Sequence, residues 1–379
     1  MLLIILLLSS IGLSNGLYQC LDNSGNPVDW FVFYKLPHLF DHKDNVPISN
    51  GTGFMYFDTN NRNWKLMDQG MDVPNNAIYY TLQQYYTSDK TQTFSYLYND
   101  EWPDSTVWSN SSGHAKGVTV FDSSTGFWLI HSIPKFPRIT EWNFPPNAHY
   151  YGQMGICISF ANQELEKVAN QLYYFNTFTY VFNAPAQFTT AVPILTKLQN
   201  KEYNLTPPLT SIQILTSLGG QVFRHFAKTG EWGKDLYSDL VVPFLRTSMK
   251  VETWNHQSGT EYNLPSICDP NGDKKQSTLS AKYIRLPYAV NYSSYEDHSK
   301  FAVSFSEDPT LPSLPWVCIG DINRQSHQTH RGGGTVCLLD QSTYYQYVNI
   351  IAETVPCNTT MNPPKIFPIY LLAIFKLFY

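Results

Sequence analysis

The tripeptide His-x-Lys occurs twice in this chain, as His114-Ala115-Lys116 and as His298-Ser299-Lys300, and the two copies are separated by about half the length of the chain. Each copy opens a run of residues typical of a β-strand, 113–122 and 297–305. Because residues i and i+2 of a strand point to the same face, each copy presents an imidazole beside an ammonium group. The repeat predicts two similar halves that share one site.

A second apolar, strand-like run follows each copy, FWLIHSIP at 127–134 and WVCIGDIN at 316–323. The two runs match at three positions: Trp128 with Trp316, Ile130 with Ile319, and Ile133 with Ile322. A strand pair that recurs in this way indicates an internal duplication, with the site at a pseudo-two-fold interface.

Further motifs extend the pattern along nearly the whole chain. They are GHAKGV at 113–118, GFWLIHSIPKFP at 126–137, DLY at 235–237, DHSKFAVS at 297–304, IGDINRQ at 319–325 and RGGGTVC at 331–337. In this order they resemble the deoxyribonuclease II family, from about Leu17 to Cys357. That family is distantly related to the phospholipase D superfamily. The resemblance implies an α/β fold, a phospholipase D-like pseudo-dimer in which each half has a central β-sheet flanked by helices.

The predicted organisation has four parts. Residues 1–16 read as a signal peptide, because an apolar run is followed by small residues; a membrane anchor is the alternative, but the run is too short to span a bilayer. The N-terminal half covers 17–190 and the C-terminal half 191–360. The apolar tail at 361–379 is a surface-packed extension or a processed lipid-anchor signal.

Two helices are expected from apolar spacing, at 162–174 and at 235–245, the second stopped or bent by Pro243. The chain also contains 26 Tyr and 23 Phe. We expect most of these aromatic residues in the core and the strands, although exposed ones could stack on DNA bases.

Six cysteines in a secreted chain predict three disulfides, and the residues alone leave the pairing open. The resemblance implies Cys20–Cys157, Cys268–Cys357 and Cys318–Cys337. A cysteine-based metal site is disfavoured, because the sequence has no C-x-x-C motif. Five N-x-S/T sequons are predicted glycosylation sites: Asn50, Asn110, Asn204, Asn291 and Asn358.

The formal charge is −5 at pH 7 with 10 histidines counted as neutral. Proteins that bind DNA normally depend on cations that neutralise phosphates. Protonation of all the histidines would reverse the sign of the charge, so the sequence predicts stronger binding to polyanions in an acidic compartment.

We expect His114 and His298 to carry the chemistry. One attacks phosphorus and forms a phosphohistidine; the other protonates the leaving 5′ oxygen and then activates the water that releases the 3′-phosphate. Analogy with the superfamily favours His114 as nucleophile and His298 as acid. Lys116 and Lys300 are predicted to hold the non-bridging oxygens.

Further candidates surround these pairs. The resemblance implies that His131 and Asn323, on the runs after each motif, orient the site. Arg324 and Arg331 are candidates for contacts with DNA phosphates. Gly332-Gly333-Gly334 is a place where DNA or another strand could approach closely.

Asp122 and Asp321 are candidates to orient the imidazoles through their carboxylates. Asp122 lies one residue further from its lysine than the phospholipase D pattern requires, and the second half has no Asp at that spacing. The superfamily motif is therefore not reproduced strictly.

The resemblance implies an acid endonuclease that cuts double-stranded DNA to 3′-phosphate and 5′-hydroxyl ends, in lysosomes or after secretion, and we expect it to act in the degradation of DNA from dying cells. We expect no cofactor and no metal, because the clustered carboxylates of a two-metal site, G-x-S-x-G and a P-loop are all missing from the sequence. The chain is expected to act as a monomer or homodimer without stable membrane association.

Two other functions remain open at this point. One is a secreted phospholipase D-like phosphodiesterase that acts on lipid headgroups, although the IGDINRQ and RGGG blocks disfavour it. The other is a catalytically inactive, secreted DNA-binding relative, which the two complete His-x-Lys pairs disfavour.

Overall fold

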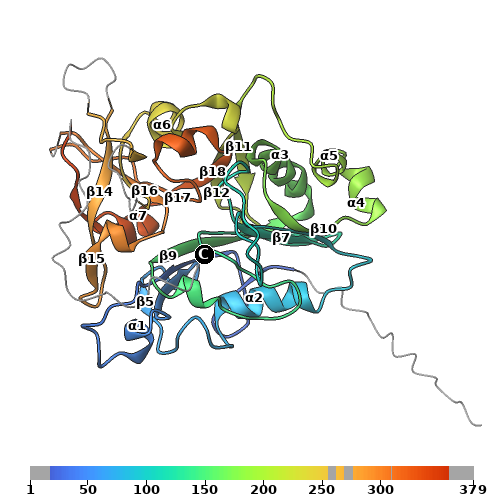
Figure 1. Ribbon diagram of the computed structural model, residues 1–379, viewed down its shortest axis with the longest axis horizontal. Coiled ribbons are helices and arrows are strands. Elements are labelled where there is room, and N and C mark those ends of the chain that lie inside the picture. Colours follow the sequence, from blue (N-terminus) through green and yellow to red (C-terminus); the bar gives the residue numbers. More distant parts are fainter. Residues whose placement is uncertain (1–17, 255–261, 269–275, 309, 358–379) are drawn as a thin grey trace, which may run out of the picture.

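The computed structural model describes residues 18–254, 262–268, 276–308 and 310–357. Two large β-sheets, one from each half of the sequence, are stacked on a shared apolar core (Figure 1). That core contains Trp30 and Ile156 from the first sheet and Phe301 and Val336 from the second. The mixed α/β fold with two sheet-containing halves is therefore as the sequence predicts.

The N-terminal sheet has eight strands within the described residues. Their spatial order is β10 (Thr179–Asn183), β6 (Phe94–Tyr98), β7 (Gly117–Phe121), β8 (Thr125–His131), β9 (Gln153–Ala161), β3 (Trp30–Lys35), β4 (Phe54–Asp58) and β5 (Lys65–Leu66). Every neighbouring pair in this order is antiparallel. A small separate hairpin joins β1 (Cys20–Leu21) and β2 (Pro27–Val28).

The C-terminal sheet has nine strands in the same described ranges. Their spatial order is β11 (Thr210–Thr216), β12 (Val222–Lys228), β18 (Gly333–Leu339), β17 (Trp316–Gly320), β16 (Phe301–Phe305), β13 (Ser248–Glu252), β14 (Thr278–Arg285) and β15 (Asn291–Ser293), and β19 (Ile351–Thr354) also pairs with β14. The β13–β14 pair is parallel.

The central five strands of the two sheets have the same arrangement. The order β6-β7-β8-β9-β3 in one sheet corresponds to β13-β16-β17-β18-β12 in the other. In each half the last strand of the meander leads into a helix, α3 (Leu165–Phe175) after β9 and α7 (Gln341–Tyr347) after β18. The duplication seen in the sequence is thus a duplication of topology.

The strand register corrects one of the matched positions. Trp128 pairs with Thr119, the third residue of β7, and the third residue of β16 pairs with Val317. The position equivalent to Trp128 is therefore Val317 and not Trp316. A shift of one residue changes the face of a strand, and Trp316 accordingly lies in the outer core of its sheet while Trp128 lies in the shared core. The isoleucines two residues further on are equivalent as predicted.

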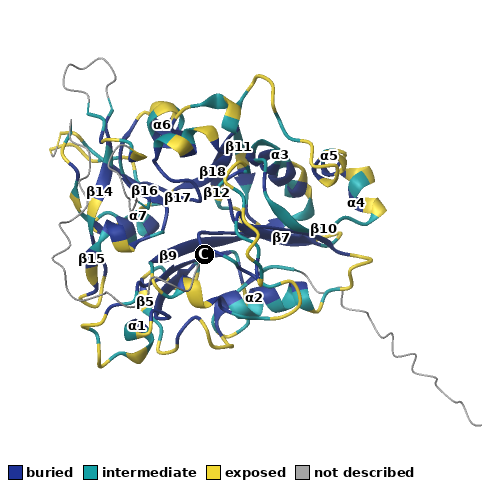
Figure 2. Cartoon of the chain, viewed as in Figure 1, coloured by how far each residue is buried: buried dark blue, intermediate teal, exposed yellow. Residues whose placement is uncertain are grey.

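Helices cover the outer faces of the two sheets. Helix α2 (Ala77–Tyr86) packs on the outer face of the N-terminal sheet, and a π-helix at Tyr237–Val241 with α6 (Val242–Leu245) packs on that of the C-terminal sheet (Figure 1). Other short helices are α1 (Val46–Ser49), α4 (Ala186–Ala191), α5 (Ile194–Gln199) and 3-10 turns at Pro146–Ala148, Asn162–Glu164, Gly230–Trp232, Ser294–Glu296 and Ser326–His330. The central strands of both sheets, among them β3, β8, β9 and β17, are almost wholly buried (Figure 2).

Both helices expected from apolar spacing are present. The first consists of the 3-10 turn at Asn162–Glu164 and α3, and it ends at Asn176, whose left-handed backbone (φ 51°) is a common helix terminus. The second consists of the π-helix and α6, with Pro243 in the first turn of α6, where a backbone N–H is not required.

Helix α3 connects the two halves. It follows β9 of the N-terminal sheet but contacts β11, β12 and β18 of the C-terminal sheet. Its buried residues, including Val168 and Leu172, belong to the shared core. The two halves therefore complete one another's core.

The six cysteines form three disulfides, Cys20–Cys157, Cys268–Cys357 and Cys318–Cys337. These are the pairs that the resemblance implies. The first joins the N-terminal hairpin to β9, and the third joins the neighbouring strands β17 and β18. The predicted signal peptide at 1–16, the tail at 361–379 and the sequon at Asn358 lie outside the described residues.

A core substitution tests whether the halves unfold together. Leu172→Ala removes a fully buried side chain from α3, and we expect the free energy of unfolding to fall by about 2–5 kcal/mol. Urea unfolding followed by circular dichroism should keep one cooperative transition. Glu166→Ala, at an exposed position of the same helix, is the matched control. Two separate transitions in the wild type would show that the halves are independent domains.

Candidate active site

Both His-x-Lys motifs lie immediately before the strands in which the sequence placed them. Strand β7 begins at Gly117 and β16 at Phe301, one residue after each lysine. The motif residues lie outside the strands because the backbone N–H groups of their histidines form hydrogen bonds with the other half of the molecule. The N–H of His114 is donated to the carbonyl of Gly332 (2.9 Å), and the N–H of His298 to that of Gly152 (2.8 Å). Each histidine is thus fixed by the opposite half.

A buried carboxylate organises the first motif. Asp100 forms an ion pair with Lys116, another with Nη2 of Arg331 at 3.2 Å, and has Oδ2 at 3.7 Å from Nε2 of His114. Burial alone would raise the pKa of Asp100, but neighbouring cations, above all Lys116 and also Arg331, hold it well below its usual range. Asp100 is therefore a permanent anion at the base of this half-site.

His114 is held in one tautomer. Its Nδ1 lies 2.5 Å from the backbone oxygen of Asp321. A carbonyl only accepts hydrogen bonds, so Nδ1 carries the proton and Nε2 of the neutral ring keeps its lone pair. Burial, followed by the charge of Lys116, lowers the pKa of His114 well below its usual value. A neutral imidazole with a free Nε2 can act as a nucleophile.

The predicted roles of the two aspartates need correction. Asp321 orients His114 through its backbone, while its carboxylate accepts the N–H of Gly334 at 3.0 Å. Burial raises the pKa of that carboxyl to about 7. Asp122 accepts the N–H groups of Ser124 and Thr125 and so closes the β7–β8 turn. Neither carboxylate bonds to a motif imidazole.

Aromatic rings surround the second histidine. His298 stacks on Tyr151 with ring centroids 4.1 Å apart and also packs against Trp254 at 4.1 Å. Its Nε2 is buried and has no hydrogen-bond partner among the residues that the structure describes. Burial, followed by the charges of Lys300 and Lys116, lowers the pKa of His298 well below its usual value.

The N-terminal half also anchors this second motif. Tyr34 of β3 donates its hydroxyl to the carboxylate of Asp297, which also accepts the N–H of Ser299 at 2.9 Å. Lys300 donates to the backbone oxygen of His298. Burial, together with the charge of Lys116, lowers the pKa of Lys300 to about 7.

The two half-sites form one electrostatic unit. The charge of Lys116, in the first motif, lowers the pKa of both His298 and Lys300 in the second. The effect is reciprocal, because Lys300 lowers the pKa of His114. Two buried lysines that repel one another in this way form a site for an anion, since an anion between them relieves the repulsion.

Within the described residues, His131 and Asn323 both have buried side-chain polar atoms without a hydrogen-bond partner. His131 is fully buried on β8, its Nδ1 accepts the N–H of Ile133 (3.2 Å), and burial followed by the charge of Lys116 lowers its pKa to about 3. Its Nε2 and both side-chain polar atoms of Asn323 have no partner within the described ranges. They are available to a bound phosphate or water.

Arg324 does not have the predicted role. It is 1% exposed, its Nε pairs with Asp235 at 3.0 Å, and its other nitrogens donate to Ser280 (2.6 Å) and the backbone oxygen of Pro265 (3.1 Å). The guanidinium therefore has no side open to a DNA phosphate, and Asp235 of the DLY motif is its carboxylate partner. The contact is a structural ion pair.

Arg331 is buried, and its guanidinium organises the first half-site. Besides Asp100, its guanidinium bonds the backbone oxygens of Ser109, Ser112 and Gly113. It thus fixes the segment that leads into the first motif. The neighbouring Gly332 is required for close approach, because a Cβ there would lie 2.1 Å from the backbone oxygen of Phe175 in α3. A helix end, and not DNA, occupies that space.

Three site residues have no signal in the repeat: Asp100, Tyr151 and Trp254. Strands β6 and β13 end at Tyr98 and Glu252, which pair with the first residues of β7 and β16. Asp100 and Trp254 each follow by two residues and so occupy equivalent positions. At this pair of equivalent positions one half has a carboxylate and the other an indole, so a search for repeated residues finds neither.

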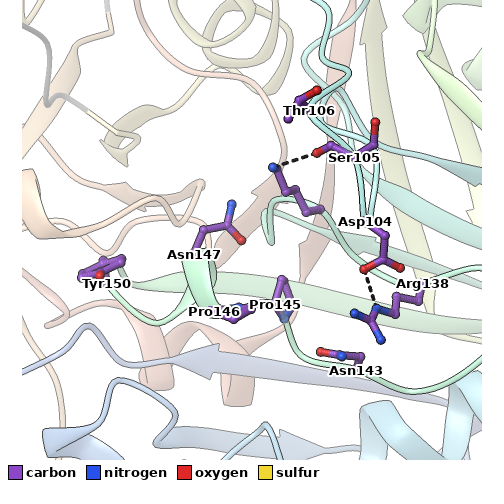
Figure 3. A pocket seen from close by; sticks show the side chains of 10 residues that line it. Asp104, Ser105, Thr106, Arg138, Asn143, Pro145, Pro146, Asn147 and Tyr150 are labelled. Carbon is purple, nitrogen blue, oxygen red and sulfur yellow. Dashed lines mark hydrogen bonds and ion pairs between the residues drawn. The ribbon is translucent and has the colours of Figure 1, made fainter. Parts of the chain in front are cut away.

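A cavity of about 720 Å³ opens beside the first half-site. It is lined by Ser105, Lys135, Arg138 and Tyr150 among others (Figure 3). A smaller cavity of about 300 Å³ shares Lys135 with it and is lined by Asp100 and Arg331. The two cavities are therefore neighbours, and the smaller one reaches two residues of the first half-site.

The histidine charge expected at acid pH is smaller than the sequence suggested. Burial lowers the pKa of His114, His131, His225 and His298, the second and third to about 3. These four do not all charge at pH 5. The positive potential of the site comes from its lysines and Arg331.

The remaining predicted features are on or near the surface. Asn50, Asn110 and Asn291 are exposed, and Asn204 is half-buried. No group of three or more His, Cys, Asp or Glu side chains in the described part of the chain is arranged to hold a metal ion. Within the same residues, no helix is long and apolar enough to cross a bilayer.

A duplicated α/β fold with paired histidines and lysines at its interface defines a class of phosphodiester-cleaving enzymes. Residues 19–357 match the sequence profile of Deoxyribonuclease II. The chain is 69% identical over 375 residues to cell death-related nuclease 6 of Caenorhabditis elegans, covering 99% of each chain. It is 35% identical over 344 residues to deoxyribonuclease-2-alpha of Rattus norvegicus (89% of this chain, 94% of the relative) and to plancitoxin-1 of Acanthaster planci (89% and 92%).

The chain therefore belongs to the deoxyribonuclease II family, and it is a deoxyribonuclease.

The buried carboxylate gives a prediction on stability and its pH dependence. Asp100→Asn leaves Lys116 and Arg331 without their anion, and we expect the free energy of unfolding at pH 5.5 to fall by about 3–5 kcal/mol. Because the folded-state pKa of Asp100 is lowered, its contribution is present above the unfolded pKa and is lost as the pH falls through the folded one. The difference from the wild type should therefore shrink below about pH 4.

Asp104→Asn is the matched control for this measurement by urea unfolding. Its ion pair with Arg138 is exposed, so the expected loss is below about 1 kcal/mol. A difference between wild type and Asp100→Asn that grows as the pH falls would contradict the proposed charge state.

Proposed function

We propose that this deoxyribonuclease is an acid, metal-independent endonuclease that cuts double-stranded DNA through a phosphohistidine, leaving 3′-phosphate and 5′-hydroxyl ends. The observation that carries the proposal is the crossed pair of hydrogen bonds that fixes His114 and His298, one from each half, in a single buried site with two lysines. Such a site supplies a nucleophile, an acid and cations for the phosphate oxygens.

His114 is the nucleophile in this mechanism. Its Nδ1–H is held by the oxygen of Asp321, so the Nε2 lone pair attacks phosphorus. The P–N bond forms as the bond from phosphorus to the 5′ oxygen breaks, and His298 gives its proton to that oxygen. In the second step His298 takes a proton from water, the water oxygen bonds to phosphorus, and the P–N bond breaks. Both histidines return to their starting states.

Lys116 and Lys300 bind the non-bridging oxygens. Asp100 fixes Lys116, and the carbonyl of His298 fixes Lys300. Burial is the main cause that lowers the pKa of His298, and the charges of the two lysines lower it further; a bound phosphodiester neutralises part of this charge and so weakens the second effect. Substrate binding thereby favours the protonated form of His298 that the first step requires.

Acid pH supports the same steps. The pKa of Lys300 is about 7, so this lysine is charged below pH 7 and loses its proton above it. Protonation of His298 in the complex also requires acid. We infer that activity falls as the pH rises through about 7, because the site then loses a phosphate-binding cation and its general acid.

The two neighbouring cavities are the proposed path of the DNA strand. Lys135 lines both, and Arg138 and Tyr150 line the larger one (Figure 3). Trp108 lines the smaller one, and Trp108 and Tyr150 are 64% and 65% exposed. Cations bind backbone phosphates irrespective of sequence, and aromatic faces stack on any base. Base preference should therefore be slight.

Substitution of Lys135 tests this path. We expect Lys135→Gln to raise KM for duplex DNA by roughly three- to tenfold, to change kcat little, and to reduce the slope of log KM against log salt concentration by about 1. Lys282→Gln, which removes an exposed lysine on β14, should leave both unchanged. Equal KM and equal salt slopes for wild type and Lys135→Gln would place the DNA elsewhere.

We place the enzyme in an acidic or extracellular compartment, either lysosomal or secreted. Three disulfides support passage through an oxidising compartment, as does the signal-like segment at 1–16. A role in degrading DNA from dying cells is supported by the name of cell death-related nuclease 6. One chain supplies both half-sites, so a monomer suffices.

Plasmid cleavage at pH 5 in excess EDTA tests the function. The wild type should nick supercoiled DNA, the rate should fall as the pH rises through 7, and His298→Ala should give no product above background. A labelled 5′-hydroxyl end on the product would complete the assignment. Cleavage that EDTA abolishes would refute the metal-independent mechanism.

A further inference from the structure

Two lysines are buried at equivalent strand ends, outside the two motifs. Lys35 is the last residue of β3 and Lys228 is the last residue of β12, and they are 0% and 1% exposed. Neither makes an ion pair among the residues that the structure describes. Burial of an ammonium group is costly, so two such groups at matching positions indicate a specific role.

Among the described residues, the hydrogen-bond partners of each lysine are backbone carbonyls alone. Nζ of Lys35 donates to the oxygens of Gly51 (3.1 Å) and His149 (2.9 Å). Nζ of Lys228 donates to the oxygens of Gln328 (3.2 Å), Thr329 (2.8 Å) and Arg331 (2.6 Å). The three N–H donors of an ammonium group allow one side chain to hold several carbonyls of a loop.

The strand register shows that these contacts are equivalent. Lys35 pairs with Gln153, the first residue of β9, and Lys228 pairs with Gly333, the first residue of β18. His149, one of the two residues whose carbonyls accept from Lys35, lies four residues before β9, and the three carbonyls that Lys228 holds lie two to five residues before β18; the other Lys35 partner, Gly51, lies in the loop before β4. Gly152 and Gly332 immediately precede β9 and β18, and their oxygens accept the N–H groups of the motif histidines.

Each lysine is therefore connected, through its loop, to the motif histidine of the opposite half. Lys35 and Gly152 belong to the N-terminal half, but Gly152 fixes His298. Lys228 and Gly332 belong to the C-terminal half, but Gly332 fixes His114. Loosening one loop should displace the histidine of the opposite half and leave the other histidine in place.

We propose that Lys35 and Lys228 are positioning residues for the reaction, Lys35 for His298 and Lys228 for His114, each acting through the loop that accepts the backbone N–H of that histidine. This inference rests on the proposed function, because it assigns separate chemical roles to the two histidines.

The surroundings support a positioning role for each lysine. Lys35 interacts electrostatically with two titratable groups of the site, Asp297 and His298. It also interacts with His149, which lies on the loop that Lys35 holds. Asp235, which is already paired with Arg324, is the carboxylate that acts on Lys228. Burial lowers the pKa of Lys228 to about 7. The lysines therefore stay in place through their carbonyl contacts and not through a salt bridge.

Two substrates separate the two roles. DNA has a poor leaving group, and its 5′ oxygen needs the proton of the acid. Bis(4-nitrophenyl) phosphate releases a stable phenolate, so it needs the nucleophile but little help from an acid. A variant with a displaced acid should regain activity on the activated ester, whereas a variant with a displaced nucleophile should not.

The experiment measures kcat and KM for wild type, Lys35→Met and Lys228→Met with both substrates, in full-length protein with intact disulfides at pH 5 with EDTA. Methionine keeps an unbranched chain and removes the charge and donors. We expect both variants to lose roughly tenfold or more in kcat on DNA, with KM changed less than about twofold. On the nitrophenyl ester Lys35→Met should return to within about threefold of the wild type, whereas Lys228→Met should not.

Lys282→Met, an exposed strand lysine, is the control and should match the wild type on both substrates. If a methionine variant does not fold, the glutamine variant at the same position, which keeps two N–H donors, takes its place and must show the same split between substrates.

Rescue of one variant but not the other supports the inference, and rescue of Lys228→Met instead would support it with the histidine roles exchanged. Unchanged kcat on DNA, or equal losses on both substrates in both variants, would overturn it and leave the lysines a purely structural role. Failure of the wild type on both substrates would remove the proposed function and the inference with it.

Discussion

The two backbone hydrogen bonds that cross between the halves are the constraint on which the site depends. Each joins the N–H of a motif histidine to a glycine carbonyl of the opposite sheet. They require the sheets to stack in one relative position, which α3 and the shared core enforce. Since each half provides the backbone acceptor for the histidine of the other half, the paired site exists only when both halves are folded and docked. This couples the stability of the core directly to the geometry of the reaction.

Within this symmetric frame the chemistry is asymmetric. Asp100 and Trp254 occupy equivalent positions after β6 and β13, and each contacts the histidine of its own side. A carboxylate beside His114 fixes Lys116 and Arg331, while aromatic rings around His298 leave its Nε2 unpaired. Duplication supplies two similar pockets, and a few unlike residues give the two histidines different environments, which the proposed mechanism assigns to a nucleophile and an acid.

The sequence predicts the duplication, the paired motifs and the helices at 162–174 and 235–245, because these depend on local patterns or on repeated residues. It does not predict Asp100, Lys35 or Lys228. Their partners lie in distant segments of the chain. The position equivalent to Asp100 is occupied by an unlike residue, Trp254. Lys35 and Lys228 are equivalent to one another, but each is an isolated lysine outside any motif. Arg324 was misassigned for the related reason that a charged residue in a motif gives no sign of its burial against Asp235. The summed histidine charge was overestimated because composition does not show which imidazoles are buried.

The most direct test of the central claim is to trap the covalent intermediate. His298→Asn would be mixed at pH 5 with thymidine 3′-(4-nitrophenyl) phosphate, whose phenolate leaves without the proton that His298 supplies to DNA, then denatured in alkali to preserve the acid-labile P–N bond, digested, and analysed by mass spectrometry. The account predicts a 3′-nucleotidyl adduct on the peptide that contains His114, and its loss in the His114→Asn, His298→Asn double variant. An adduct on any other residue, or its complete absence from a folded variant that still binds DNA, would contradict it.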